Sequence, residues 1–265
     1  MTSDPKVDTQ SGGRWVPLES NPEVFNSWSQ KAGLITSQAH FVDIYGVDDE
    51  LLGLVPKPVK AVILLFPIDK ESEARKREED ELIEKEGLPK VDNTIFFVKQ
   101  TIGNACGTIG LIHALANSNV SFTPESALQK FIMECEDKNP AERAQALETT
   151  PLFANIHAET ASSGQTAPPS DLDTDLHFTC FVQAPDADIR EAAQGGSVSD
   201  AARNDEKSTG MRLVELDGRR AGPLDRGECK DLLTDVAQLV KTRYMSMSTS
   251  VYFSLMALTE GDDDY

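Results

Sequence analysis

The sequence predicts a mixed fold, of α/β or α+β class, in which helices surround a central sheet. One observation is a continuous apolar run at 61–68, flanked by prolines, which is typical of a buried central strand. A second is a set of capped or charged helical segments on both sides of this run. A third is a pair of apolar strand candidates at 177–183 and 211–217. The length of 265 residues suits one large domain or two small ones.

The first predicted helix runs from Asn21 to Gly33. Asn21 suits the N-cap, Pro22 suits the first helical position, and Gly33 suits the end. The other elements expected in the first half are strands at 41–45 and 94–98, the central strand at 61–68, and a charged helix at 70–86 that Gly87 closes.

The second half combines helices with two polar segments. A helix begins near residue 105 and carries Ile109, Ile112, Leu115 and Ala116 on one face. The stretch 159–175 has almost no large apolar side chain, so we predict a long mobile loop there. We further expect helices at 126–136, 140–148 and 232–243, a polar insertion at 184–210, a strand at 250–258, and flexible termini at 1–13 and 260–265.

Composition excludes several functional classes. The net charge of −19 argues against nucleic acid as a partner and fits either a basic partner or simple solubility. No apolar run is long enough to span a bilayer, and the N-terminus lacks a signal core, so we expect a cytoplasmic or nuclear protein that binds no membrane.

The four cysteines are expected to be free thiols. They form no CxxC pair and no Cys/His cluster with zinc spacing, so we predict neither a metal site nor a cofactor. Cys135, Cys180 and Cys229 are interpreted as small buried hydrophobes.

Cys106 is the candidate nucleophile. It follows a Gly-Asn turn and opens a helix, whose N-terminal N–H groups and dipole stabilise a thiolate. Gln100 lies six residues earlier, where its amide could join the Cys106 N–H in an oxyanion hole. Together these residues indicate nucleophilic catalysis.

The general base is assigned to His177 by elimination. His113 lies two helical turns beyond Cys106, roughly 10 Å along the axis, which is too far to share a proton. His157 is expected at the edge of the mobile loop, and His40 precedes a strand with no carboxylate immediately beside it. His177 opens a strand directly after the loop.

Asp217 is the candidate for orienting this histidine. If Gln183 pairs with Met211 in an antiparallel hairpin, His177 falls opposite Asp217, and apolar residues match apolar residues. Asp217 alone would also suit a turn, because Asp-Gly is a strong turn pair.

With these residues in place, the chain resembles the UCH family of ubiquitin carboxyl-terminal hydrolases from Trp15 to about Leu258. The matching blocks are RWVPLESNPEV at 14–24, FVDIYG at 41–46, QTIGNACGTIGLIHA at 100–114, GQTAPPS at 164–170, DLHF at 175–178 and VELDGR at 214–219. The insertion at 184–210 and the acidic tail depart from the short-form pattern, as does Ser250, where the pattern has an acidic residue.

The resemblance implies a single α+β (α-β-α) catalytic domain over 14–259 with flexible termini. It implies a central antiparallel sheet between helical lobes, a papain-like cysteine protease core and a knotted backbone. It assigns catalytic roles to Cys106, His177, Asp217 and Gln100, and it places the 159–175 loop across the active site. It also implies that Leu18, Glu19, Glu23, Asp43 and Phe253 lie near bound ubiquitin.

The function predicted in this way is that of a deubiquitinating thiol protease. It would hydrolyse the bond after the C-terminal glycine of ubiquitin and release small adducts or peptides, acting as a monomer. The alternatives are a non-catalytic protein that binds and stabilises free ubiquitin, and a hydrolase directed at the ubiquitin-like modifier NEDD8.

Overall fold

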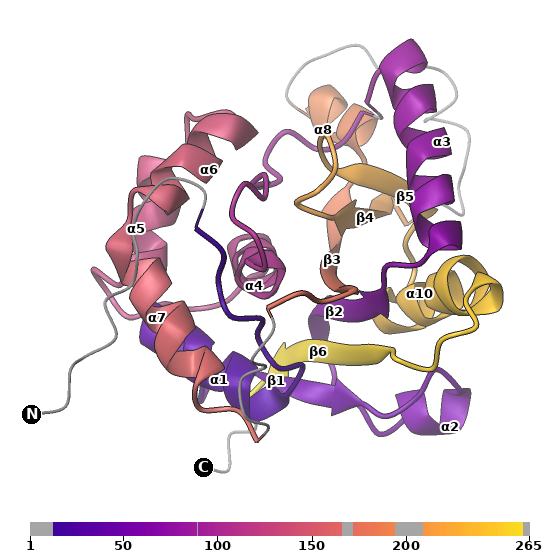
Figure 1. Cartoon of the computed structure of the whole chain (residues 1–265). Helices are drawn as coiled ribbons and strands as arrows, with labels where there is room; N and C mark the ends of the chain where they lie inside the picture. The colour runs from indigo at the N-terminus through magenta and orange to yellow at the C-terminus, as the bar shows by residue number, and fades with distance from the viewer. Residues whose placement is uncertain (1–12, 89, 166–171, 194–208, 262–265) are drawn as a thin grey trace, which may run out of the picture.

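The computed structural model describes residues 13–88, 90–165, 172–193 and 209–261. Within these residues an antiparallel sheet forms the middle layer, with strand order β1-β6-β2-β3-β4-β5 (Figure 1). The strands are β1 (Ala39–Ile44), β2 (Val59–Pro67), β3 (Leu176–Pro185), β4 (Met211–Leu216), β5 (Leu224–Glu228) and β6 (Ser254–Glu260).

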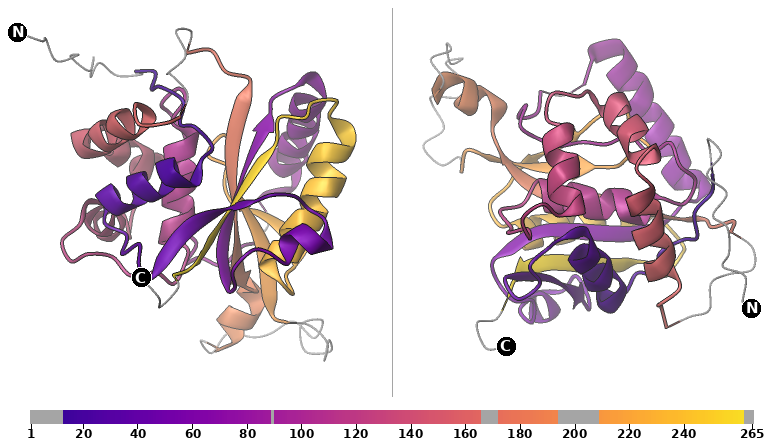
Figure 2. Two further views of the ribbon diagram at one scale, coloured as in Figure 1. Left: turned by 90° about the horizontal axis from the view of Figure 1, so that it is seen from below. Right: turned by 90° about the vertical axis from the view of Figure 1, so that its left-hand side faces the viewer.

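Helices cover both faces of this sheet, as the two views of Figure 2 show. One face carries α1 (Pro22–Ala32), α4 (Cys106–Ala116), α5 (Ala127–Glu134), α6 (Pro140–Glu148) and α7 (Pro151–Ala161). The other face carries α3 (Lys70–Glu86) and α10 (Leu232–Leu239), which continues into a π-helical turn, η1 (Val240–Tyr244), and a 3-10 turn, η2 (Met245–Met247). The short helices α2 (Asp49–Leu52) and α8 (Ala187–Ala193) lie toward the ends of the sheet. The arrangement is the predicted α+β layering of helices, sheet and helices.

Local chemistry explains where the first helices begin and end. The side chain of Asn21 accepts a hydrogen bond from the backbone N–H of Glu23 at 2.8 Å, and Gly33 ends α1 in the left-handed conformation with φ 119°. In α3, Asp69 and Ser72 form a reciprocal capping box. Both helices have the limits that the sequence predicts.

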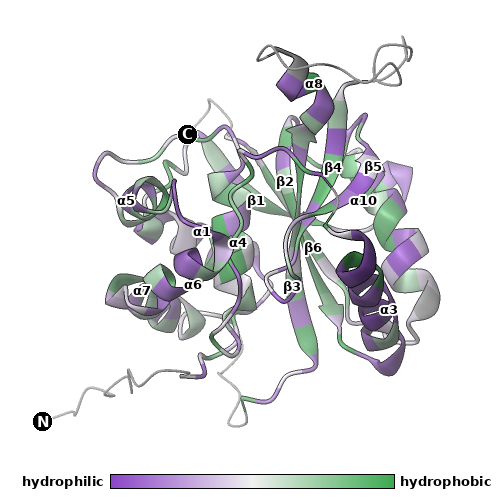
Figure 3. Ribbon diagram, turned by 90° about the horizontal axis from the view of Figure 1, so that it is seen from above, coloured by the Kyte–Doolittle hydropathy of each residue, from purple (hydrophilic) through white to green (hydrophobic). Residues whose placement is uncertain are grey.

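Two apolar cores lie on opposite faces of the sheet. The larger one joins β2 and β3 to α1 and the α4–α7 lobe, and ten residues of α4 are buried. The smaller one lies between the sheet and α10. Figure 3 shows the strands mostly in green, whereas α3 is almost wholly purple. Because α4 is enclosed on all sides, its N-terminus is held rigidly at the edge of the larger core.

The predicted strand at 94–98 is wrong. Thr94 lies in a turn and residues 95–98 form no strand, and the segment pairs with the side chains of His113 in α4 and of Asn117, the C-cap of α4. The amide of Asn117 bonds to both the N–H and the C=O of Phe96, and His113 Nε2 accepts from Val98 N–H. Because these side chains satisfy hydrogen bonds of the backbone, the apolar segment can be buried without pairing to another strand.

The prediction of a loop from residue 159 is also wrong at its start. Helix α7 continues to Ala161, and His157 lies buried within it. The last strand begins at Ser254, later than predicted, and includes Glu260, which we had placed in the tail. Helix α7, the short elements α2 and α8, and strand β5 were not predicted, because their sequences are short or only weakly patterned.

Some predictions lie outside the described residues. These are most of the N-terminal segment 1–13, positions 166–171 of the polar loop, positions 194–208 of the insertion and the tail at 262–265. Among the residues that the structure does describe, no helix has both the length and the apolar character needed to cross a membrane.

Candidate active site

Cys106 is the first residue of α4, directly after a sharp turn. Asn104 adopts a left-handed conformation with φ 60°, and Ala105 takes the N-cap position. Alanine has no side-chain acceptor, so it leaves the first N–H groups of α4 for another anion. Cys106 is 8% exposed, and its thiol contacts the backbone of Gly107 and Phe178.

His177 is positioned beside Cys106 by β3. Its Nε2 lies 2.7 Å from Asp217 Oδ1, and Asp217 also accepts from the backbone N–H of Arg219 at 2.9 Å. The imidazole packs edge-on against Phe66 of β2, with ring centroids 5.6 Å apart. His177 therefore has a carboxylate at one ring nitrogen and the thiol of Cys106 as its second polar neighbour.

The predicted hairpin register is wrong by two residues. Cys180 pairs with Leu216, and Met211 pairs with Pro185, whereas we had paired Met211 with Gln183. A shift of two leaves every side chain on the same face, so the apolar matching could not detect it. Asp217 lies just beyond the end of β4 and reaches His177 from the turn that the Asp-Gly pair forms. The predicted contact is present, but it is not a cross-strand pair.

The electrostatics of these three residues favour an ion pair. Burial alone would raise the pKa of the Cys106 thiol, but the adjacent His177 outweighs it and lowers this pKa. Burial opposes the charged form of His177, yet Asp217 and Cys106 raise its pKa to about 10. Burial likewise opposes the charge of Asp217, and His177 nevertheless lowers its pKa to about 2. At neutral pH the arrangement can hold a thiolate, an imidazolium and a carboxylate in sequence.

Gln100 lies on the approach to this turn. Its Nε2 donates to the carbonyl of Ile102 at 3.2 Å, and its Oε1 is buried without a hydrogen-bond partner among the described residues. The amide carries two protons, so one remains for a further acceptor. This is chemically compatible with an oxyanion donor beside the Cys106 backbone N–H.

Two contacts brace the Gln100 segment against the turn that carries Asp217. The backbone N–H of Gln100 donates to the carbonyl of Gly218 at 2.9 Å. His113 accepts from Val98 N–H at 2.9 Å, and its Nδ1–H donates to Leu216 O at 3.1 Å. Burial lowers the pKa of His113 to about 4, so it is neutral. As predicted, His113 is a packed helix residue.

Asn104 ties two other segments to the nucleophile turn, a role that the sequence analysis missed. Its Nδ2 donates to Trp15 O at 2.9 Å and to Leu172 O at 2.8 Å. The Gly-Asn pair before Cys106 signalled a turn, but the distant partners of this amide cannot be derived from local sequence.

The other histidine of this lobe, His157, has a structural role. Its ring lies 2.9 Å from Thr108 Oγ1 and 2.6 Å from Val16 O, and burial lowers its pKa to about 4. Cys135, Cys180 and Cys229 are buried, as predicted, and burial raises the pKa of each thiol. The described part of the chain contains no group of three or more His, Cys, Asp or Glu side chains that could hold a metal ion.

The residues expected near bound ubiquitin occupy neighbouring segments. Leu18 is buried over the first turn of α4, where it approaches Gly107 closely. Ser20 Oγ donates to Ser254 Oγ at 2.8 Å and brings this segment to the start of β6. The remaining four residues are Glu19 beside Gly164, Glu23 exposed on α1, Asp43 half-buried on β1 and Phe253 half-buried before β6.

Comparison with known proteins adds to this geometry. The family model of ubiquitin carboxyl-terminal hydrolase, family 1, matches residues 15–246. A ubiquitin carboxyl-terminal hydrolase 3 of Arabidopsis thaliana is 37% identical over 258 residues, which cover 96% of this chain and 97% of that protein. The human ubiquitin carboxyl-terminal hydrolase isozyme L1 is 34% identical over 247 residues, covering 91% and 96% respectively.

A solved structure has the same fold. The catalytic domain of Trichinella spiralis UCH37, bound to ubiquitin vinyl methyl ester, superposes with a TM-score of 0.68 and 22% identity. The match covers 96% of this chain and 99% of that chain.

Proposed function

Because the chain belongs to family 1 of the ubiquitin carboxyl-terminal hydrolases, we propose that it hydrolyses the bond following the C-terminal glycine of ubiquitin. The observation that carries this proposal is the position of His177, 2.7 Å from Asp217 and in contact with the thiol of Cys106. The depressed pKa of Cys106 and the raised pKa of His177 suit a nucleophile and a general acid.

The proposed reaction has two halves. The Cys106 thiolate attacks the carbonyl carbon of the terminal glycine, and the Cys106 N–H and Gln100 amide stabilise the oxyanion. Protonated His177 gives its proton to the leaving amine as the C–N bond breaks, which leaves a thioester. Neutral His177 then takes a proton from water, whose oxygen attacks the thioester and releases ubiquitin with a free carboxylate. Asp217 holds the imidazole in the required orientation throughout.

We further propose that the leaving groups are small adducts or short peptides. The described ends of the 159–175 segment support this idea, because both are attached near the nucleophile. Gly164 packs against Glu19, and Leu172 bonds to Asn104. If the segment lies across the active site, as the resemblance implies, it restricts which leaving groups can enter. Comparing a short C-terminal extension of ubiquitin with a chain of folded ubiquitins tests this proposal, and equal rates on both would overturn it.

The test of the main proposal is an assay with ubiquitin bearing a fluorogenic C-terminal amide. We expect turnover by the native protein and none by Cys106→Ala, with ubiquitin binding retained in that variant. Binding without turnover by the native protein would support a non-catalytic ubiquitin-binding protein. The same assay with NEDD8 distinguishes the two modifiers by their kcat/KM values.

We also propose a monomer that resides in the cytoplasm and the nucleus. Four free thiols are typical of a reducing compartment, which supports this location. Sedimentation of the purified protein tests the monomeric state, and imaging of a fluorescent fusion tests the location. A stable dimer or secretion would contradict them.

A further inference from the structure

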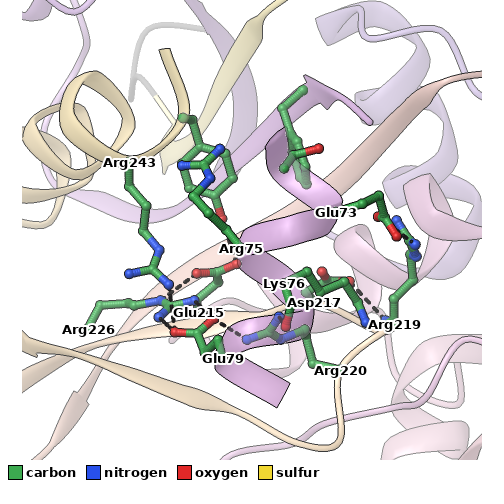
Figure 4. Close-up of a pocket in the computed structure, with 13 residues that line it drawn as sticks. Glu73, Arg75, Lys76, Glu79, Glu215, Asp217, Arg219, Arg220, Arg226 and Arg243 are labelled. Carbon is green, nitrogen blue, oxygen red and sulfur yellow. Dashed lines mark hydrogen bonds and ion pairs between the residues drawn. The ribbon is translucent and has the colours of Figure 1, made fainter. Parts of the chain in front are cut away.

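Helix α3 is attached to the rest of the molecule by charge rather than by an apolar stripe. None of its residues, all of which the structure describes, is fully buried, and most of them are hydrophilic (Figure 3). A helix of this kind needs polar contacts to stay in place. Its contacts converge on the back of the active site, in the pocket drawn in Figure 4.

Glu79 is the centre of these contacts. Its carboxylate bonds to Arg220, to Arg226 with Nη1 at 2.5 Å, and to Arg243 with Nη2 at 2.6 Å. Figure 4 shows the three guanidinium groups, from different parts of the chain, pointing toward this one carboxylate. We call Glu79, Arg220, Arg226 and Arg243 the Glu79 cluster. Burial opposes the charge of Glu79, but the arginines outweigh it and lower its pKa to about 2, so the cluster remains charged throughout the working pH range.

One arm of the cluster reaches the turn that carries Asp217. The backbone N–H of Arg220 donates to the carbonyl of Asp217 at 2.9 Å, which closes the turn. The Arg220 side chain, only 4% exposed, contacts Glu79 and the carbonyl of Lys76. A fixed Arg220 therefore fixes the backbone from which the Asp217 carboxylate projects.

A second arm reaches His177 through the interior. Arg226 Nε donates to Glu215 at 2.6 Å, and the hydroxyl of Tyr244 donates to the other oxygen of Glu215 at 2.7 Å. The Tyr244 ring packs against Phe66 with centroids 4.9 Å apart, and Phe66 packs against His177. The Glu79 cluster thus supports both members of the His177–Asp217 pair from behind.

We propose that Glu79 is a positioning residue for catalysis and that α3 is an electrostatic brace for the His177–Asp217 pair. The proposal rests on the roles proposed above for Cys106, His177 and Asp217. Without the Glu79 charge, Arg220 and Arg226 would be two largely buried cations that have lost their shared acceptor, with side chains 4% and 8% exposed. The nearest remaining carboxylates are Asp80, 3.3 Å from Arg220 Nη1, and Glu215, 2.6 Å from Arg226 Nε. Both guanidinium groups would shift toward these partners, and the turn that Arg220 closes would carry the Asp217 carboxylate away from His177.

The decisive variant is Glu79→Gln, which keeps the shape of the side chain and removes its charge. Glu78→Gln is the matched control, because Glu78 is its exposed neighbour on the same helix. Iodoacetamide reacts with the thiolate, so its rate with Cys106 against pH reports the ion pair without any ubiquitin. The other three thiols do not compete, since each is 0% exposed and has a raised pKa, whereas Cys106 is 8% exposed and has a lowered pKa.

We expect Glu79→Gln to alkylate more slowly at neutral pH, with reactivity recovered only at higher pH, because a weakened His177–Asp217 pair stabilises the imidazolium less. On the fluorogenic ubiquitin substrate, kcat should fall roughly 10- to 100-fold with little change in KM. Glu78→Gln should match the native protein in both assays, and Glu79→Asp should recover part of the loss.

Arg220→Gln separates positioning from folding, because it removes the side chain that ties the Asp217 turn to Glu79 and leaves Glu79 its contacts with Arg226 and Arg243. It should reproduce the alkylation profile of Glu79→Gln, and the double variant should be no worse than the more impaired single variant. A lowered Tm with native alkylation and native kcat in both single variants would overturn the proposal. If Glu79→Gln fails to fold, the alkylation profile and kcat of Arg220→Gln alone decide whether the proposal holds. Failure of ubiquitin turnover in the native protein would overturn the proposed function, while the alkylation assay would still test the brace.

Discussion

The backbone N–H of Gln100 donates a 2.9 Å hydrogen bond to the carbonyl of Gly218. This bond joins the segment before the nucleophile to the turn that presents Asp217, although 118 positions separate the two residues in the numbering. The candidate oxyanion donor and the carboxylate that orients the base are therefore fixed to each other directly. A displacement of either segment should therefore impair both oxyanion stabilisation by Gln100 and orientation of His177 by Asp217.

Gly218→Ala tests this close approach. A Cβ on Gly218 would lie 2.9 Å from Ile109 Cγ2, 3.0 Å from Gln100 Cβ and 3.2 Å from Gln100 N, so the two segments must separate. We expect a loss of about 1–3 kcal/mol in the free energy of unfolding, measured in urea, together with a lower kcat.

Gly110→Ala is the matched control for this substitution. It adds the same methyl group to α4, but the nearest atom to the new Cβ would be 3.8 Å away. It should be neutral or stabilise the protein by about 0.5–1 kcal/mol, since alanine favours helix. Similar losses from both substitutions would show that the Gly218 contact has no special importance.

Asp217→Asn should change the pH dependence of activity as well as its size. The active pair requires a pH above the pKa of Cys106 and below that of His177, which Asp217 helps to raise to about 10. Loss of the carboxylate charge lowers the pKa of His177, so the alkaline limb of kcat/KM should move to lower pH. We expect kcat to fall roughly 10²–10⁴-fold with the fold intact. An unmoved alkaline limb would contradict the assignment of Asp217.

Gln100→Ala should lower kcat by roughly 10²–10³-fold, the usual loss for one oxyanion donor, with little effect on KM. The buried Oε1 of Gln100 has no hydrogen-bond partner among the described residues, so its removal leaves no described donor without an acceptor. Gln145→Ala, on the exposed side of α6, serves as the control. If kcat is unchanged in Gln100→Ala, another group must stabilise the oxyanion.

Two substitutions separate the backbone role of Asn104 from its side-chain role. Asn104→Gly keeps the left-handed conformation without strain but removes the bonds to Trp15 and Leu172. Asn104→Ala removes the same bonds and also strains the left-handed backbone. We expect the alanine variant to be less stable than the glycine variant by about 1 kcal/mol in urea unfolding. Both should be cut faster by protease near 172–175 than the native protein is. Native protease resistance in both would show that the side-chain bonds do not hold that segment.

The sequence predicted those parts of the fold whose signals are local. Asn21, Pro22 and Gly33 define α1, and Cys106 opens α4, because capping and turn chemistry act within a few residues. The segment 94–98 is mispredicted because its apolar residues are indeed packed in a core, but the hydrogen-bond partners of its backbone are the side chains of His113 in α4 and of Asn117 at the end of α4. Apolar pattern shows burial and does not identify the hydrogen-bond partner.

For the candidate site, the sequence predicts which residues come together but not the contacts that position them. Cys106, His177 and Asp217 do come together, but the His177–Asp217 contact was derived from a register that is shifted by two residues. The positions of Asn104 and of the Glu79 cluster depend on contacts across more than 60 residues, which no local pattern encodes. The contacts with ubiquitin expected of Leu18, Glu19, Glu23, Asp43 and Phe253, and the knotted backbone, are implied by the resemblance and stay predictions.

The position of β6 between β1 and β2 has a consequence for how the protein is made. Both neighbours belong to the first 67 residues, whereas β6 spans Ser254–Glu260. During translation the nascent chain therefore carries β1 and β2 with a vacant place between them, exposing strand edges that readily pair with other chains. The sheet closes only after residues 254–260 have left the ribosome. Proteolytic competence should thus arise only once β6 has emerged, and until then the emerging polypeptide is a natural client for chaperones.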